Sequence, residues 1–201
     1  MASGVLFRKD GYLVHTNILI RPIAALGRRK MSTIHGIVVH QTGGTTLAGA
    51  LNSAAQKQGV GAHFYIDKDG TIVQVASLDF TCGHVGLLKP RCMVEHRCKP
   101  DQARMLSKMK PRDISKLEYQ KDYPERFPGN ADSVGIELVG YYHAVKGKKE
   151  PEYDSITSEQ QVALKWIVNV ICSHKGVRAS EIYRHPDVSW KNPSEAASAK
   201  W

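Results

Sequence analysis

Short, β-prone apolar runs alternate with amphipathic helical patterns along most of the chain, and this alternation constrains the fold more than any other feature. Strands are expected at residues 34–40, with Ile37-Val38-Val39 at the centre, and at residues 133–139. Helices are expected to begin at Thr46 and at Thr157, which are good N-cap residues followed by apolar positions at helical spacing. The pattern predicts one α/β (α+β) domain, with a central mixed β-sheet flanked by helices.

A β-hairpin and two less regular segments complete the expected framework. The runs 62–66 and 71–75 flank Asp69-Gly70, a dipeptide typical of hairpin turns. Pro22 follows the apolar run 18–20, so a strand there is expected only at an edge of the sheet. The tail after Ile182 has no clear period and is expected to be a loop.

The composition excludes several classes of protein. Apolar residues make up 42% of the 201 residues and charged residues 23%, as in ordinary globular chains. There is no apolar stretch long enough for a membrane span, and the N-terminus lacks the pattern of a secretory signal. We therefore expect synthesis in the cytoplasm and, for action outside it such as in the periplasm, export by a route without a signal peptide; a cytoplasmic site of action is the alternative.

The four cysteines do not form a CxxC pair. Cys92 and Cys98 are close enough in sequence to bridge, but four cysteines are too few for a disulfide scaffold. Free thiols are expected for all of them, which are Cys82, Cys92, Cys98 and Cys172.

The net charge of +9 is concentrated in two segments. Residues 1–31 carry +5 and are expected to form a basic N-terminal arm before the main domain at 32–201. Residues 89–126 also carry +5, within an insertion at about 89–130 for which one short helix near 102–109 is expected. Such charge attracts polyanions, among them nucleic acid, anionic lipid and acidic wall polymers, or is simply a solvated surface. Nucleic acid is disfavoured because no aromatic residues are interleaved with the basic ones.

Two histidines and a carboxylate stand in separate elements. His40 ends a strand before the turn Gln41-Thr42-Gly43-Gly44, His185 precedes Pro186-Asp187, and Glu195 follows ten positions later. Catalytic zinc needs three such ligands and an open fourth position, where it makes water a nucleophile at neutral pH. Each histidine taken alone is more often a packed structural residue.

The order of the motifs is more specific than any one of them. The sequence resembles the type 2 N-acetylmuramoyl-L-alanine amidase family, which includes phage amidases, muropeptide-recycling amidases and peptidoglycan-recognition proteins. The resemblance spans about residues 32–201 and rests on Ile37-Val38-Val39-His40-Gln41-Thr42-Gly43-Gly44, on the run from Gly61 to Ile72, on Cys82-Gly83-His84-Val85-Gly86, on the run from Asn130 to Leu138, and on Arg184-His185-Pro186-Asp187-Val188 with Lys191 and Trp201.

The resemblance implies one zinc ion per chain, held by His40, His185 and Glu195. The family has Asp or Cys as third ligand, so Glu195 is a departure. It also implies that Glu137 is the general base and then acid, and that Lys191 stabilises the oxyanion. His84 matches a histidine that lines the substrate groove and is expected to bind substrate.

The expected function is hydrolysis of the amide bond between N-acetylmuramic acid and L-alanine in peptidoglycan. We expect a cell-wall-degrading, bacteriolytic enzyme, either an antibacterial toxin delivered by a type VI-like system, with a small inhibitor (immunity) protein as a partner, or an endolysin. Cytosolic recycling of muropeptides is the alternative role. A peptidoglycan-binding module without catalysis is the alternative from another class of protein.

Overall fold

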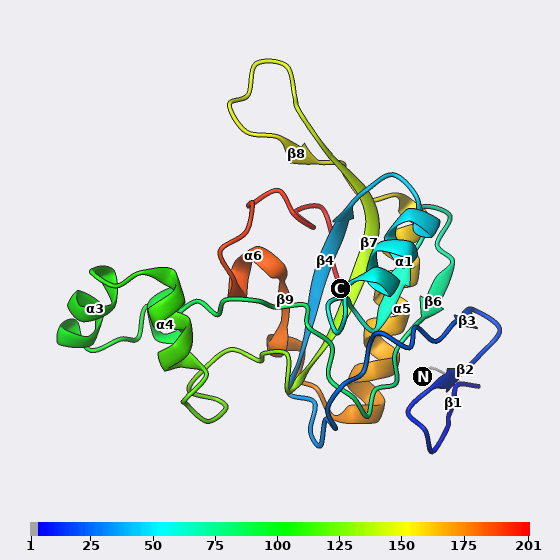
Figure 1. The fold of residues 1–201 in the computed structure, drawn as a ribbon, viewed down its shortest axis with the longest axis horizontal. Helices are drawn as coiled ribbons and strands as arrows, with labels where there is room; N and C mark the ends of the chain where they lie inside the picture. The colour runs from blue at the N-terminus through cyan, green and yellow to red at the C-terminus, as the bar shows by residue number, and fades with distance from the viewer. Residues whose placement is uncertain (1–3) are drawn as a thin grey trace.

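A mixed β-sheet organises the chain in the computed structural model, which describes residues 4–201. Six strands follow the order β3-β6-β5-β7-β4-β9, and β8 pairs with the far end of β7 (Figure 1). Their bounds, in sheet order, are Ile18–Ile20, Ile72–Gln74, Phe64–Ile66, Ser133–His143, Gly36–Gly43 and Ile182–Arg184, with β8 at Glu152–Tyr153. The pairs β5–β6 and β7–β8 are antiparallel, and the other neighbours are parallel. This confirms the predicted fold class.

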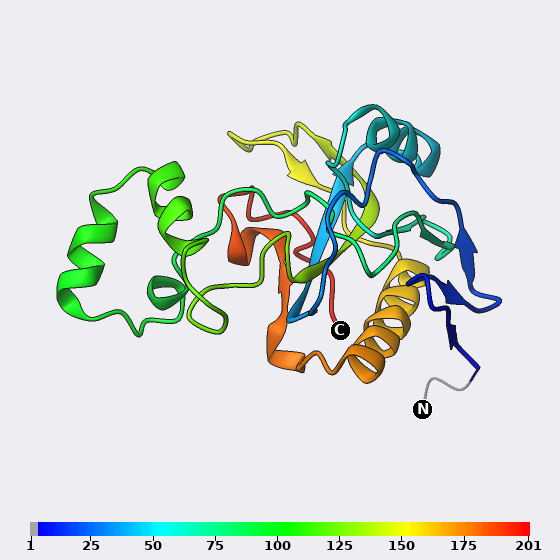
Figure 2. The same cartoon turned by 60° about the horizontal axis from the view of Figure 1, so that its bottom comes forward.

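Helices cover both faces of the sheet. The long helix α5 (Ser158–Lys175) packs on one face and α1 (Leu47–Gln56) on the other, as the two views of the ribbon show (Figures 1 and 2). The alternation along β4 sets the two sides, since Ile37 and Val39 join the core under α5 whereas Val38 faces the opposite way. His40 lies on the same side as Val38, away from α5.

The predicted helix starts are confirmed. Thr46 caps α1 by accepting from the amide of Gly49, and Thr157 forms a capping box with Gln160 at the start of α5. Gln160 is buried, and its Nε2 also donates to the carbonyls of Ile66 and Val139. The cap of α5 thus ties the helix to the interior strands β5 and β7.

The tail after Ile182 is secondary structure as far as Val188, so its prediction as a loop was wrong there, whereas residues 189–201 form no helix or strand, as predicted. Residues 182–184 form β9, which pairs with β4, and α6 follows at His185–Val188. A 3₁₀ turn at Ala179–Glu181 precedes them. Elements this short have no detectable period, and pairing with a long neighbouring strand decides their structure.

The described part of the N-terminal segment packs into the body. A small hairpin of β1 (Leu6–Phe7) and β2 (Leu13–Val14) leads into β3, which pairs with β6 as an edge strand. The buried side chains of this segment are Leu13, Ile18, Leu26 and Met31. Residues 4–31 therefore contribute core to the domain and are not a free arm.

Residues 89–130, hereafter the helical lobe, project from one side of the body (Figures 1 and 2). They contain three helices, α2 (Arg91–Val94), α3 (Pro100–Ser107) and α4 (Pro111–Glu118), where one was expected. The lobe has a small core of its own, built on Cys92, Leu106 and Ile114.

Cys92 and Cys98 form a disulfide in this lobe, so the expectation of free thiols was wrong for this pair. Cys82 and Cys172 are free. The bridge is consistent with the small size of the lobe, because a core of a few side chains gains from a covalent link. In residues 4–201, we find no helix with the length and apolar character that a membrane crossing requires.

Candidate metal centre and active site

Two neighbouring parallel strands place the first site residues side by side. His40 on β4 is in register with Glu137 on β7, and Glu137 is in register with Tyr65 on β5. Because residues in register on parallel strands point to the same face, all three side chains lie on the face opposite α5. A polar row thus crosses the middle of the sheet.

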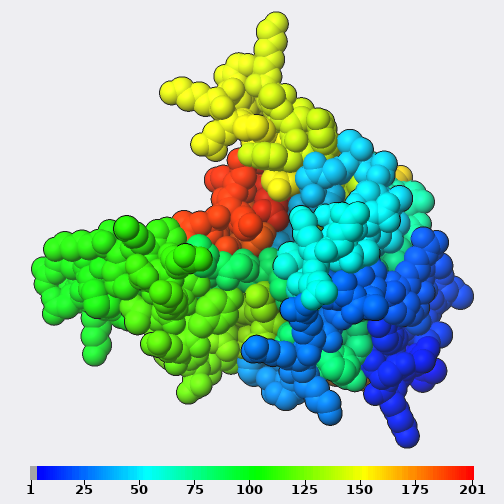
Figure 3. Space-filling view, in the orientation of Figure 1, coloured from blue at the N-terminus to red at the C-terminus, as the bar shows by residue number. Residues whose placement is uncertain are grey.

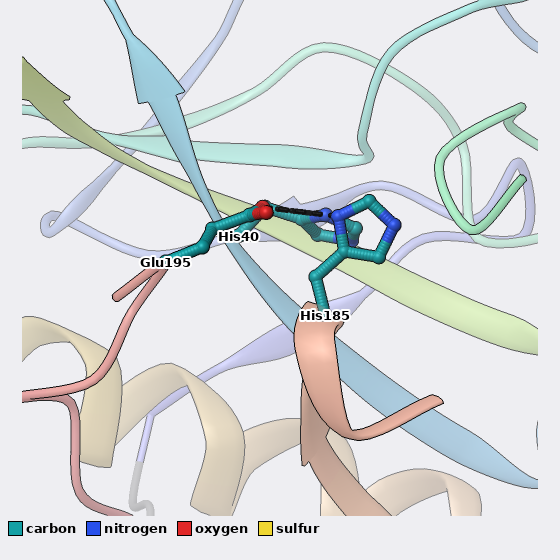
Figure 4. Close-up of side chains that lie close together, drawn as sticks. All are labelled: His40, His185 and Glu195. Atoms are coloured by element: carbon teal, nitrogen blue, oxygen red, sulfur yellow. Dashed lines mark hydrogen bonds and ion pairs between the residues drawn. The ribbon is translucent and has the colours of Figure 1, made fainter. Parts of the chain in front are cut away.

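The C-terminal segment brings two more groups to this row. His185 opens α6 directly after β9, and Glu195 lies in the following turn. The side chains of His40, His185 and Glu195 point toward one another (Figure 4). Glu195 Oε1 is 3.0 Å from His185 Nδ1 and 3.6 Å from His40 Nδ1. The structure therefore brings together the three residues predicted as zinc ligands.

The donor set fits a divalent cation. The three ligand atoms lie within 4.8 Å of one another and their residues are all buried. Donors around tetrahedral zinc are separated by about 3.4 Å, given bond lengths near 2.1 Å. His185 Nε2 lies 2.9 Å from the carbonyl of Val85, which can only accept, and a ring that donates there keeps the Nδ1 lone pair for a cation shared with Glu195. Lone pairs that converge in this way need a cation between them.

The pKa values of these groups favour the forms that bind metal. Burial lowers the pKa of His40 to about 4, and the charge of His185 acts in the same direction, so His40 is neutral near pH 7. Burial alone would raise the pKa of Glu195, but the polar contacts with His185 and His40 lower it to about 2. A neutral imidazole and an ionised carboxylate are the forms that ligate zinc.

Glu137 lies beside the cluster in a different environment. Its Oε2 is buried and has no hydrogen-bond partner in residues 4–201. Burial, reinforced by the negative charge of Glu195 and opposed by Lys191, raises the pKa of Glu137 to about 8. A buried carboxyl with a free oxygen and a pKa near neutrality can take up and release a proton.

A cavity of about 340 Å³ opens over these residues. His40, Glu137 and His185 form its floor, and Tyr142, Tyr153 and the exposed Lys191 contribute to its walls. Figure 3 shows the C-terminal segment between the helical lobe and the projecting β7–β8 hairpin. Lys191 thus lines the same cavity as Glu137, which is the placement that its predicted role requires.

The loop that carries Glu195 is held by residues that the sequence analysis did not single out. The Asn192 side chain donates to Tyr142 and to the Pro151 carbonyl, and its Oδ1 accepts from Ser194. Gln41 Oε1 accepts from the amide of Ala196, and Gln41 Nε2 donates to the carbonyl of Asp154. Gln41 directly follows the predicted ligand His40 in the sequence. This position was the signal that could have identified Gln41 as a residue of the site.

His84 is among the residues that line the cavity, as expected, and it also contacts a predicted zinc ligand. It is 9% exposed and lies behind His40, with Nδ1 3.1 Å from His40 Nε2. His63, which was left out of the metal set, is fully buried and bonds only to backbone groups of Gly135 and Phe80. His84 thus lines the cavity and contacts a predicted zinc ligand, and its role in binding substrate stays a prediction.

Comparison with solved structures places this fold among cell-wall amidases. AmpD superposes with a TM-score of 0.54 at 17% identity, over 91% of this chain and 88% of AmpD. AmiD from E. coli, solved with the substrate anhydro-N-acetylmuramic acid-L-Ala-D-gamma-Glu-L-Lys, gives 0.52 at 16% identity, over 92% of this chain and 58% of AmiD. AmpDh3 from Pseudomonas aeruginosa, in complex with anhydromuramic pentapeptide, gives a TM-score of 0.52 at 15% identity, over 84% of this chain and 55% of AmpDh3. A search of curated proteins finds no match.

A mixed sheet with two histidines and a carboxylate converging on one face is an architecture suited to metal-assisted hydrolysis. The family profile of N-acetylmuramoyl-L-alanine amidases (Amidase_2) matches residues 30–200, which is most of the chain. The chain belongs to this family, as its motifs predicted, and the family supports a peptidoglycan amidase activity.

Proposed function

We propose that this chain is a zinc-dependent N-acetylmuramoyl-L-alanine amidase that degrades cell-wall peptidoglycan. The observation that carries the proposal is the convergence of His40 Nδ1, His185 Nδ1 and Glu195 Oε1 beside the buried carboxyl of Glu137. Family membership supports the bond that we propose is cut, between N-acetylmuramic acid and the L-alanine of the stem peptide.

His40, His185 and Glu195 would hold the zinc ion, which when bound supplies Lewis acidity to the amide carbonyl and makes water nucleophilic at neutral pH. Glu137 takes the proton of the attacking water and returns it to the leaving amine of L-alanine. The burial of Glu137 supports this role, because its raised pKa lets the carboxyl hold the proton between the two steps. Lys191, on the wall of the same cavity, brings a positive charge to the oxyanion.

We propose polymeric peptidoglycan, and not small recycled muropeptides, as the physiological substrate. Two features of the helical lobe support this choice. Its exposed cations suit the carboxylates of the wall, and its Cys92–Cys98 disulfide is typical of oxidising compartments outside the cytosol. A delivered toxin and an endolysin both fit this substrate.

Digestion of purified sacculi by the zinc-loaded protein tests the activity. The expected products are free stem peptides and intact glycan strands. Release of disaccharides, or no release with the metal site saturated, would contradict the proposal, and the second result would leave a binding module as the function. A parallel assay on soluble anhydro-muropeptides tests the role, since a clear preference for these small substrates would favour recycling.

A further inference from the structure

One short segment of the chain lies behind both histidines of the proposed zinc site. His84 Nδ1 is 3.1 Å from His40 Nε2, and the carbonyl of the next residue, Val85, is 2.9 Å from His185 Nε2. We propose that His84 is a positioning residue, whose ring fixes the tautomer and orientation of His40 so that the Nδ1 lone pair of His40 faces the metal position. The inference rests on the proposed metal-dependent function and gives His84 a role besides the predicted one in binding substrate.

The hydrogen bonds around His84 define which of its nitrogens carries the proton. His84 Nε2 is 3.3 Å from the carbonyl oxygen and 3.3 Å from Oγ of Ser133. The carbonyl can only accept, and the Ser133 hydroxyl already donates to the carbonyl of Gly129 at 2.6 Å. Both oxygens of Ser133 therefore act as acceptors toward His84, and the ring proton of His84 is on Nε2.

The state of His40 follows from this assignment. A neutral imidazole with its proton on Nε2 has a lone pair on Nδ1, so His84 Nδ1 accepts from His40 Nε2. The proton of His40 is then on Nε2, and its Nδ1 is free toward Glu195. This is the same tautomer that the Val85 carbonyl imposes on His185. Partners of this kind, behind the ligands, orient them and typically change metal affinity by 10–100-fold when removed.

The fold builds a close-fitting socket for the His84 ring. A Cβ atom at position 135 would lie 2.8 Å from His84 Cγ, so only glycine leaves room for the ring against β7. The backbone amides of His84 and Val85 both donate to Asn130 Oδ1, at 2.9 and 2.8 Å. Asn130 thereby holds the segment that supports both proposed ligands.

His63 provides an internal comparison for a structural role. It is buried like His84, its ring is 5.9 Å from that of His84, and it also makes hydrogen bonds through both ring nitrogens. All its partners are backbone groups, and none is a proposed zinc ligand. If His84 served only to fill the core, replacing either histidine would have the same kind of effect.

The test compares His84→Phe, His84→Asn and His63→Phe in the full chain. Zinc affinity is measured by competition with a chelator, the tautomer of His40 by long-range ¹H–¹⁵N NMR of the metal-free protein, and folding by thermal unfolding. We expect His84→Phe to weaken zinc binding by about 10–100-fold and to mix the tautomers of His40. His84→Asn keeps an acceptor near the Nδ1 position and should retain most of the affinity. His63→Phe should lower thermal stability while the folded protein binds zinc as the wild type does.

Equal zinc affinities in wild type and His84→Phe, with His40 still in one tautomer, would overturn the proposal. Equal losses of affinity in His84→Phe and His63→Phe would overturn it too. If His84→Phe does not fold, Asn130→Ala is compared with Asn130→Asp, which keeps the acceptor for the segment, and only Asn130→Ala should lose zinc affinity. The NMR readout needs neither zinc nor turnover. A protein in which His40 has the expected tautomer but which cuts no peptidoglycan would therefore refute the proposed function and leave this inference standing.

Discussion

The body around the site and the helical lobe differ in the burial and pairing of their polar and charged side chains. In the body, polar side chains are buried and paired, as in the contacts of His84, Ser133 and Gln160. In the lobe, four exposed cations form no ion pair with any of residues 4–201; they are Lys99, Lys108, Lys110 and Arg112. Buried pairing fixes geometry, whereas exposed charge attracts partners without fixing them. We infer that the chemistry belongs to the body and the attraction of the wall polymer to the lobe.

The two regions are nevertheless joined beside the site. Arg91 at the root of the lobe makes two hydrogen bonds to the buried carboxylate of Glu181, which precedes β9. Tyr119 donates to the carbonyl of Gly86, and the amide of Leu88 donates to Ser115. These contacts anchor the lobe to the chain that continues from His84 and Val85, so its root is part of the support of the site.

The largest expected effect is on the body. Glu137→Gln should lower the rate of peptidoglycan hydrolysis by roughly 10²–10⁴-fold, because it removes the proton acceptor while keeping the shape of the side chain. The rate is measured on purified sacculi, and zinc content should remain that of the wild type. Glu125→Gln makes the same change on the exposed surface of the lobe and should leave the rate unchanged. Persistent turnover in Glu137→Gln would show that the base is another group.

The same substitution should stabilise the metal-free protein. The folded-state pKa of Glu137 is about 8, above its value in an unfolded chain, so ionisation opposes folding. This penalty is absent below about pH 4.5, grows as the pH rises and reaches on the order of 3 kcal/mol at pH 7. Glu137→Gln removes it.

The measurement is the difference in free energy of unfolding between the two chelator-treated proteins from pH 5 to 8. Buried histidines such as His63, whose pKa burial lowers to about 4, contribute the opposite slope below about pH 6.5 in both proteins, so that slope cancels in the difference. A difference that does not change with pH would contradict the raised pKa of Glu137.

The next effect should be confined to the lobe. Cys98→Ser removes the bridge to Cys92 and should cost about 2 kcal/mol of local stability, seen as roughly 30-fold faster amide exchange in residues 91–118. Exchange in the central strands should not change. Cys172→Ser, at a free and half-buried thiol on α5, is the matched control. Faster exchange across the whole sheet would mean that lobe and body unfold as one unit.

The smallest expected effect is on binding to the wall. Replacing Lys108, Lys110 and Arg112 by Gln should weaken binding to sacculi roughly tenfold at low salt, with little difference at high salt, because exposed charges are screened. Hydrolysis of a small muropeptide should be unchanged. The control changes three cations of the body to Gln, namely Lys9, Lys165 and Lys200, and so has the same net charge. Equal weakening in both variants would show that binding to sacculi depends on net charge and not on the position of the cations in the lobe.

The sequence predicted the parts of the molecule in which local pattern and tertiary structure agree. The strands containing His40 and Glu137 and the helices beginning after Thr46 and Thr157 have strong periods and caps, and the structure confirms them. The structure does not show the expected basic N-terminal arm as a free segment, because Leu13 and Ile18 are buried in the body. Deleting residues 1–31 would therefore remove part of the core. Charge counted along the chain does not show which segments also carry buried apolar side chains.

The candidate site was predicted as a set of residues but not as a geometry. Spacing along the chain placed His40, His185 and Glu195 in separate elements, and only the pairing of β9 with β4 brings them together. His84 carried a motif signal, yet its contact with His40 depends on the absence of a side chain at Gly135, a packing detail that no pattern shows. The disulfide of the lobe was likewise hidden, because two cysteines six positions apart fit both a bridge and free thiols.

The metal content of the purified protein tests the central claim most directly. Native mass spectrometry of the zinc-saturated wild type should show one zinc ion per chain. Glu195→Ala should lose most of this binding, and the variant with Lys108, Lys110 and Arg112 replaced should keep it. A wild-type protein that binds no zinc, or one whose zinc is indifferent to Glu195→Ala, would contradict the assignment of His40, His185 and Glu195 as the metal centre of the body.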